Sequence, residues 1–186
     1  MTAAEEEIRI VSASPEYLES FRECLDSVAR ERRWLSIVEA FPLDEIRKFI
    51  AKTSQQGGSA FFAVLGRRVV GWADCHWEGH ETTRHRRVLG MAVHADYRGR
   101  GLGIRLLQTL IADAKVKGVM RLDLSVYASN SAAMGLYKKL GFVQEGRKRK
   151  SLYLDGRFDD SIQMGLIFPE NLPADVASRS DKPPGT

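Results

Sequence analysis

VLGMAVHADYRGRGLGIRLL, residues 88–107, is the stretch of sequence on which the fold of this chain depends. Its first residues are apolar and β-compatible, and its last ones carry apolar side chains at helical spacing. We therefore expect a strand at 88–93 and a helix from about Gly101, joined by an arginine- and glycine-rich turn. A helix start exposes unpaired N–H groups and the positive dipole end, and glycines leave them uncovered. This predicts an anion site, most naturally for a phosphate or pyrophosphate.

Two other phosphate-binding motifs can be excluded. A P-loop ends in Gly-Lys-Ser/Thr, which this sequence lacks. A dinucleotide-binding fingerprint needs G-x-G-x-x-G, and Leu106 stands at the position of the third glycine. Asp123 lies about where a ribose-binding acid would be expected, but the missing glycine argues against that interpretation.

The remaining pattern is Arg-x-x-Gly-x-Gly, formed by Arg98, Gly101 and Gly103 after the strand. It closely resembles the acyl-CoA-binding motif of the GNAT superfamily of N-acetyltransferases. A second segment, NSAAMGLYKKLGF at 130–142, resembles the other family hallmark, Asn-x-x-Ala-x-x-Leu-Tyr-x-x-x-Gly-Phe. The two motifs stand in the family's order and at its distance, and the resemblance covers roughly residues 8–168.

The resemblance implies acetyl-CoA as co-substrate. Backbone groups of 91–93 would hold the pantetheine arm and acetyl carbonyl, N–H groups of 99–103 would bind the pyrophosphate, and Asn130 would bond the pantetheine. By themselves, the two arginines could be solvated turn residues and Asn130 a helix cap. The residues that the resemblance assigns to the co-substrate are Met91, Ala92, Val93, Arg98, Gly99, Arg100, Gly101, Leu102, Gly103, Asn130 and Tyr137.

Tyr137 is the catalytic residue that the resemblance assigns, because it matches the family tyrosine beside the CoA sulfur. A phenol with a pKa near 10 is protonated at neutral pH and can protonate a leaving thiolate. The other interpretation is an aromatic side chain on the packed face of a short helix.

The general base is not identified by the resemblance. Family members that acetylate ribosomal-protein N-termini have a glutamate on the fifth strand, where this chain has Ser125. Other members have a glutamate on the fourth strand, where this chain has Gly-Met-Ala at 90–92. Each remaining candidate is more commonly structural or solvated, and a water chain could serve instead. These candidates are Glu39, Asp74, His76, Glu78 and His94.

We expect direct attack on the acetyl-CoA thioester by a primary amine of a small molecule or a protein N-terminus. The alternative is a non-catalytic acyl-CoA-binding sensor or regulatory module, which the absence of the usual glutamates would favour. Trp34, Phe41, Trp72 and Trp77 could line an acceptor pocket or belong to the core. The basic run 147–150 fits a solvated strand edge, so no nucleic-acid partner is expected. Whether the protein forms a homodimer is left open by the sequence.

Composition indicates a globular chain of 186 residues with 44% apolar and 28% charged residues. A net charge of +4 suits an anionic ligand such as CoA. There is no apolar run of membrane-spanning length, and the acidic start MTAAEEEIRI is unlike a targeting peptide, so we expect a cytoplasmic protein without a membrane partner. Cys24 and Cys75 lack metal-ligand spacing and are interpreted as buried thiols, with no metal expected.

The predicted order of elements is β-α-α-β-β-β-α-β-α-β-β, with a tight hairpin at Asp155-Gly156. This order predicts an α/β (α+β) chain with a mixed, mostly antiparallel sheet of six to seven strands and helices on both faces. It resembles the GNAT fold in the order of its elements. The resemblance further implies that the fourth and fifth strands are parallel and splay around the co-substrate. We assign 1–168 to a GNAT N-acetyltransferase domain and 169–186 to a polar, proline-containing tail.

Overall fold

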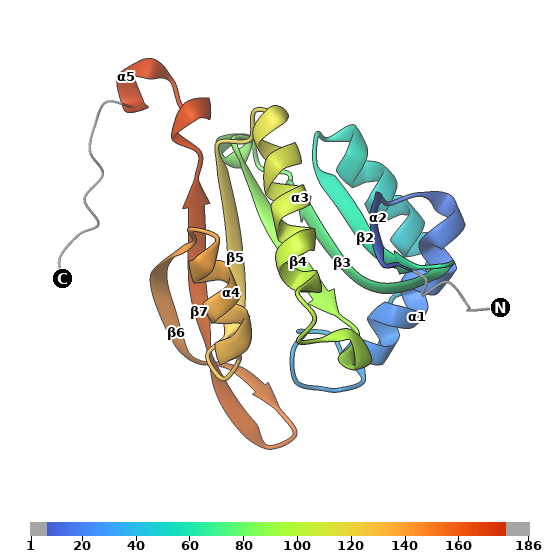
Figure 1. Ribbon diagram of the computed structural model, residues 1–186. Coiled ribbons are helices and arrows are strands. Elements are labelled where there is room, and N and C mark those ends of the chain that lie inside the picture. Colours follow the sequence, from blue (N-terminus) through green and yellow to red (C-terminus); the bar gives the residue numbers. More distant parts are fainter. Residues whose placement is uncertain (1–6, 178–186) are drawn as a thin grey trace.

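Seven strands pair in the order β1-β2-β3-β4-β5-β7-β6 and form one sheet (Figure 1). The computed structural model describes residues 7–177. Only the β4–β5 pair is parallel, which confirms the mixed, mostly antiparallel sheet expected from the sequence. The strands are β1 (Arg9–Ser12), β2 (Ser59–Leu65), β3 (Arg68–His76), β4 (Arg86–Val93), β5 (Arg121–Tyr127), β6 (Val143–Leu154) and β7 (Arg157–Ile167).

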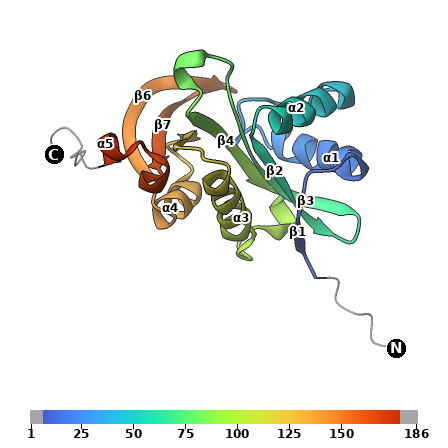
Figure 2. The same cartoon turned by 90° about the horizontal axis from the view of Figure 1, so that it is seen from above.

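Helices cover both faces of this sheet, again as expected (Figure 2). One face carries α1 (Leu18–Ala29) and α2 (Leu43–Gln55), and the other carries α3 (Leu102–Val116) and α4 (Ser131–Lys139). Each pair of helices packs on its own buried apolar cluster. The sheet therefore separates two layers of core, and a residue's position in its strand decides which layer it enters.

Strand β3 shows how this sorting works. Ala73 and Cys75 belong to the apolar cluster under α3, whereas Trp72 belongs to the cluster under α1 and α2. Side chains alternate along a strand, so Asp74 and His76 face the same way as Trp72. Both Cys24 and Cys75 are buried free thiols, as the sequence predicted, and burial raises their pKa values.

Strands β4 and β5 pair along only a short stretch, where 86–88 lies against 121–123. Beyond that point β4 keeps its pairing with β3 and β5 its pairing with β7, so the sheet opens between them. Figure 1 shows the separation widening toward the end of β4. This confirms the splayed parallel pair that the resemblance implied.

Ion pairs close the joined end of the two strands. Arg86 on β4 donates to Asp123 on β5 at 2.8 Å, and Arg121 donates to the other carboxylate oxygen at 2.7 Å. Arg121 also binds Glu145 of β6, and these two carboxylates raise its pKa. Asp123, which a dinucleotide-binding site would have used for a ribose, therefore holds β4 and β5 together.

The chain after β7 remains attached to the domain. The Asn171 side chain donates to the carbonyls of Lys115 and Val119, at 3.0 and 2.8 Å, and α5 (Ala174–Ala177) follows. The boundary at residue 168 stays a prediction, and the second half of the polar tail, residues 178–186, lies outside the described residues. Between residues 7 and 177 no helix has the length and apolar character needed to cross a membrane.

Replacing Leu106 by alanine should destabilise the protein by about 2–5 kcal/mol, because this α3 side chain is fully buried against the sheet and its removal leaves a cavity. Val116 on the same helix is 88% exposed, so Val116→Ala should change stability by less than about 0.5 kcal/mol. Urea unfolding of both variants measures the difference. Equal losses would contradict the assigned packing of α3.

Candidate active site

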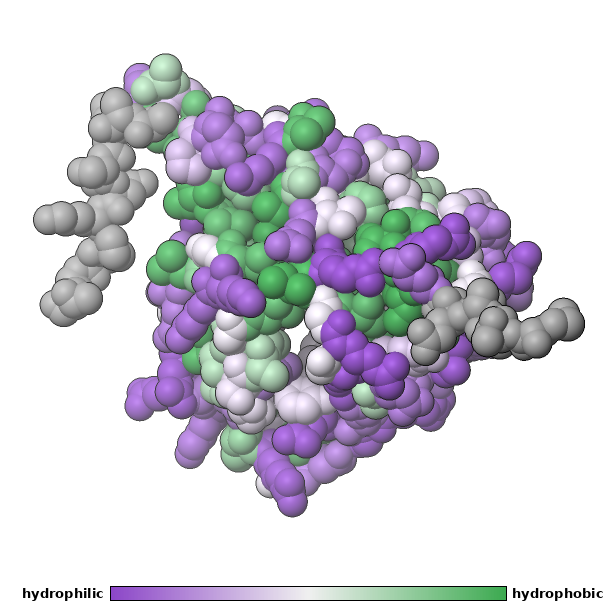
Figure 3. Space-filling view, viewed as in Figure 1, coloured by the Kyte–Doolittle hydropathy of each residue, from purple (hydrophilic) through white to green (hydrophobic). Residues whose placement is uncertain are grey.

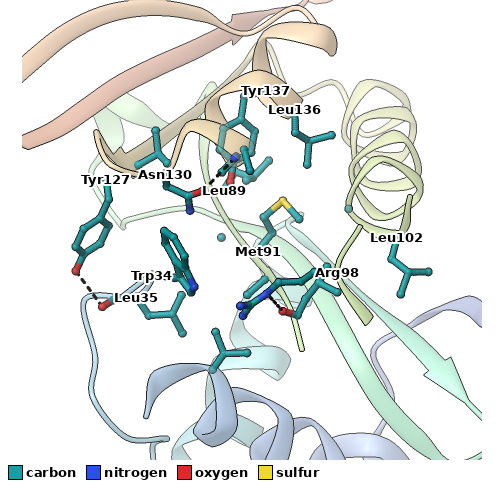
Figure 4. Close-up of a pocket in the computed structure, with 18 of the residues that line it drawn as sticks. Trp34, Leu35, Leu89, Met91, Arg98, Leu102, Tyr127, Asn130, Leu136 and Tyr137 are labelled. Atoms are coloured by element: carbon teal, nitrogen blue, oxygen red, sulfur yellow. Dashed lines mark hydrogen bonds between the residues drawn. The ribbon is translucent and has the colours of Figure 1, made fainter. Parts of the chain in front are cut away.

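A cavity of about 690 Å³ opens where β4 and β5 separate. Its walls come from both strands, the turn before α3, the helix α4 and the connection between α1 and α2 (Figure 4). Figure 3 shows the corresponding hollow between α4 and the turn that precedes α3. Leu89, Met91 and Leu136 give much of this cleft an apolar lining.

The edge of β4 that faces the cleft is free of strand pairing from Leu89 to Val93. The opposite edge of the same segment is paired with β3. A ligand with its own amide groups can therefore lie along β4 and complete the missing ladder, as an added strand does. Met91, Ala92 and Val93, all predicted as co-substrate-binding residues, line the cleft at this edge.

The glycine turn shapes the end of the cleft. Gly99 and Gly101 have left-handed backbone angles, with φ of +73° and +76°, which glycine adopts without the strain of other residues. Gly101 is the N-cap of α3, so the N–H groups of 102–104 start the helix without an intrahelical partner. These N–H groups and the positive end of the helix dipole suit an anion, and the phosphate or pyrophosphate site expected from the sequence stays a prediction.

Gly103 allows α3 to approach its neighbours closely. A Cβ atom at this position would lie 3.0 Å from Leu136 Cδ2 and 3.5 Å from Met91 Cε. The glycine therefore keeps the start of α3 against both walls of the cleft. Leu102 beside it is buried and also lines the cleft.

The two arginines of the turn differ in position. Arg98 lines the cleft, but its Nε donates to the Val93 carbonyl at 2.8 Å and its Nη1 donates to Glu31 at 2.8 Å. Its charge is thus paired, and it fixes the end of β4 to the end of α1. Arg100 is not among the lining residues, and its guanidinium lies over the Tyr97 ring, 5.4 Å from the centroid.

Tyr137 and Asn130 lie across the cleft from Arg98 (Figure 4). Tyr137 is 7% exposed and packs edge-on against Phe142, and burial raises its pKa, so the phenol remains protonated at neutral pH. The Asn130 side chain accepts from Ala133 N at 3.1 Å and caps α4 while it lines the cleft. Both residues therefore have a packing role as well as a place at the site.

The α1–α2 connection closes one side of the cleft and is fixed at three points. Glu31 binds Arg98, Arg32 pairs with Asp155 of the β6–β7 turn at 2.6 Å, and the Leu35 carbonyl accepts from the Tyr127 hydroxyl at 3.0 Å. None of these contacts could be predicted from the sequence. Their partners are far apart in the chain, and no local pattern indicates them.

A second cavity, of about 490 Å³, lies on the α1–α2 face of the sheet. It shares Leu35, Ser36, Gly90 and Met91 with the cleft, so the two cavities meet at β4. Aromatic and aliphatic side chains of α1, α2 and their connection form most of its lining. We refer to it as the α-face pocket.

Asp74 and His76 are the two base candidates that the structure brings together, because both line the α-face pocket. His76 Nδ1 lies 3.3 Å from Asp74 Oδ2. Burial of Asp74 raises the pKa of its carboxyl, against the opposing effect of His76.

The other three base candidates line neither cavity. Glu39 is exposed and lies 3.9 Å from Arg30 Nη2, Glu78 pairs with Arg86 at 2.8 Å, and His94 accepts from Asp96 N in the turn that follows β4.

Ser125, the residue in the place of the family's fifth-strand glutamate, lines the cleft and shares a hydrogen bond of 2.5 Å with Ser161. Of the four aromatic candidates for an acceptor pocket, Trp34 lines the cleft and Phe41 and Trp72 line the α-face pocket. Trp77 lines neither cavity and donates to the His80 carbonyl.

Comparison with known proteins relates this site to an established family. Residues 18–142 match the model of the acetyltransferase (GNAT) family. The chain is 44% identical over 81 residues to "[Ribosomal protein bS18]-alanine N-acetyltransferase" of Escherichia coli (strain K12), covering 42% of this chain and 53% of the relative. It is 33% identical over 99 residues, 53% of this chain and 58% of the relative, to "L-methionine sulfoximine/L-methionine sulfone acetyltransferase" of Pseudomonas paraeruginosa (strain DSM 24068 / PA7).

This chain therefore aligns with only about half the length of these curated relatives. A crystal structure of an acetyltransferase of the GNAT family from Streptococcus pneumoniae superposes with a TM-score of 0.81 at 28% identity, covering 87% of this chain and 100% of that one. The family match extends over more than half of the chain and includes both motifs, the turn before α3 and the helix α4. The chain belongs to the acetyltransferase (GNAT) family.

Proposed function

We propose that this protein transfers an acetyl group from acetyl-CoA to a primary amine of a small molecule or of a protein N-terminus. The observation that carries the proposal is the free edge of β4 leading to the glycine turn at the start of α3. One end of this path suits the amides of pantetheine, and the other suits a pyrophosphate. The described cleft is formed by one chain, so the proposal does not require a second copy.

Four features of the cleft support acetyl-CoA as the co-substrate. The edge of 91–93 offers the missing hydrogen-bond ladder, the N–H groups of 99–103 offer the anion site, and Asn130 stands beside the path between them. The lining of the middle is apolar, as a thioester and its methyl group require. Within residues 7–177 no group of three or more His, Cys, Asp or Glu side chains could hold a metal ion.

Tyr137 is the proposed acid. When the amine nitrogen bonds to the acetyl carbon, the C–S bond breaks and the sulfur needs a proton. The Tyr137 phenol is protonated because burial raises its pKa, and it lines the same cleft as the β4 edge. The position of this phenol beside the β4 edge supports the proposal that Tyr137 protonates the sulfur.

A non-catalytic acyl-CoA sensor is the alternative. A sensor needs no general base, and this chain has Ser125 and the Gly-Met-Ala of 90–92 where other family members have a glutamate. A second pocket that opens onto the cleft favours an enzyme, because a sensor needs no acceptor site. The names of the relatives describe acetylation of an alanine in a ribosomal protein and of methionine derivatives, so both acceptor classes belong to the proposal. The two buried free thiols fit a reducing cytoplasm.

Gly101→Asp should weaken acetyl-CoA binding at least about tenfold, because a carboxylate at the N-cap repels the pyrophosphate by about 1.4 kcal/mol or more. Aspartate is strained at the left-handed φ of +76° of Gly101, so the control variant must carry the same backbone strain. Gly118→Asp is the matched control: its φ is +73°, a Cβ there meets no atom within 4 Å, and it follows the other end of the same helix. Calorimetry with acetyl-CoA should show normal affinity for the control, and equal affinity in both variants would reject the anion site.

Tyr137→Phe should lower kcat by about 100-fold at neutral pH while the acetyl-CoA affinity stays within a few-fold, because the substitution removes the proton donor and keeps the ring packing. Tyr153→Phe removes a phenol that is 65% exposed on β6 and serves as the control. Steady-state kinetics with a panel of amines measures both. Equal kcat values in the parent and both variants would show that the phenol of Tyr137 does not protonate the sulfur.

A further inference from the structure

We infer that the α-face pocket is the acceptor site, that it takes a primary amine carried on an apolar group, and that Asp74, assisted by His76, removes the proton from that amine. This inference rests on the proposed acetyl transfer and names the acceptor class and the base.

The two cavities adjoin each other at β4. The cleft and the α-face pocket share Gly90 and Met91 of β4, and Leu35 and Ser36 lie on the opposite side of the junction. An acetyl group held along the β4 edge in the cleft therefore lies next to an amine held in the α-face pocket.

The second argument is the position of the carboxylate. Asp74 and Gly90 are direct partners in the β3–β4 register, and a Cβ atom on Gly90 would lie 3.1 Å from Asp74 Oδ1. Because residue 90 has no side chain, nothing from β4 covers this oxygen. The carboxylate of β3 thus reaches the place where a side chain of β4 would begin.

The surroundings of Asp74 suit a base. Its carboxylate is buried and its hydrogen-bond partner is His76. Among residues 7–177 neither Lys nor Arg lines the pocket, so no fixed cation of the pocket wall holds the carboxylate ionised. The other titratable group that lines the pocket is Glu45 of α2, whereas α1 contributes Phe21 and Leu25 and β4 contributes Gly90 and Met91. Burial raises the pKa of Asp74, which increases its affinity for a proton.

His76 connects the carboxylate with solvent. Its side chain is 30% exposed, its Nδ1 lies 3.3 Å from Asp74, and its ring packs edge-on against Phe49. An incoming ammonium gives one proton to Asp74, and His76 passes it on to water. The neutral nitrogen bonds to the acetyl carbon, and the C–S bond breaks as Tyr137 gives its proton to the sulfur. The nitrogen's second proton then returns to the Tyr137 oxygen and restores the phenol. The products are an amide, free CoA and one released proton.

The third argument is the lining of the α-face pocket, which selects the acceptor. Its wall is formed by large apolar side chains, and its two acidic groups attract an ammonium. Phe41 and Phe49 at this wall are 47% and 38% exposed, and an apolar group on the amine would cover them. The large apolar residues of this wall include Phe41, Ile46, Phe49 and Trp72.

The test measures acetyl transfer by the full chain to 2-phenylethylamine and isoamylamine, with ethanolamine and putrescine as polar counterparts. A parallel arm uses short peptides that differ only in an apolar or a charged first residue. We expect kcat/KM at least about tenfold higher for the apolar member of each pair. A preference for the apolar member among the small amines alone identifies a small molecule as the acceptor. The same preference among the peptides alone identifies a protein N-terminus. Equal or better transfer to the polar members overturns the assigned acceptor class.

Asp74→Asn should lower kcat about 100-fold or more for the best amine, with unchanged acetyl-CoA affinity in calorimetry. The parent should lose activity as the pH falls through the raised pKa of Asp74, and this limb should be absent from the residual activity of the variant. Glu39→Gln removes an exposed carboxylate outside both cavities and should retain full activity. Turnover by Asp74→Asn at the parent's rate, with the parent's pH profile, overturns the assignment of the base.

Stability distinguishes a lost base from a damaged fold. The folded-state pKa of Asp74 is raised, so ionisation of this carboxyl destabilises the folded protein. The full cost applies above the folded-state pKa, and it disappears below the unfolded-state pKa. Asp74→Asn should therefore melt at a higher temperature than the parent at pH 7, and the difference should shrink as the pH falls toward 4. An inactive variant that melts lower at pH 7 would show that Asp74 is structural. If acetyl-CoA does not bind the parent, or binds without transfer to any amine, the proposed function itself fails and this inference with it.

Discussion

The ion pairs at the joined end of β4 and β5 are the constraint on which the site depends. Arg86 and Arg121 hold opposite oxygens of Asp123, and all three side chains are less than one-third exposed. The parallel pairing ends at Val88, just beyond these contacts. A sheet fixed at one end and open at the other provides an unpaired strand edge inside the domain. Elsewhere an unpaired edge is a liability, and here it is the proposed binding surface.

The two ends of the proposed reaction path have opposite electrostatic character. The start of α3 presents backbone N–H groups and the positive end of the helix dipole to an anionic co-substrate. The α-face pocket presents Asp74 and Glu45 to a cationic amine. Arg98 is neutralised by Glu31 between them, so the middle of the path carries little net charge. In the proposed reaction, this separation guides each substrate to its own side of β4 and leaves an apolar place for the thioester.

The order of elements, both helix faces and the glycine turn could be predicted from the sequence, because each depends on local periodicity or on a motif of a few residues. The joined end of β4 and β5 could not, since Asp123 meets Arg86 only after the α3 crossover has brought the two strands together. The Tyr127–Leu35 contact could not be predicted either, because its partners also lie far apart in the sequence. Among five base candidates, the sequence could not distinguish Asp74 and His76. Their selection depends on strand register, on the glycine opposite Asp74 and on the neighbouring pocket.

The most direct test of this account is a crystal structure of the protein with a bisubstrate compound, in which the CoA sulfur is joined through an acetyl bridge to 2-phenylethylamine. The account predicts the pyrophosphate at the N–H groups of 99–103, the bridge between Met91 and Tyr137, and the phenyl ring in the α-face pocket beside Phe49, with the nitrogen near Asp74. A compound bound outside the opening between β4 and β5, or with its phenyl group directed away from the α-face pocket into solvent, would contradict it.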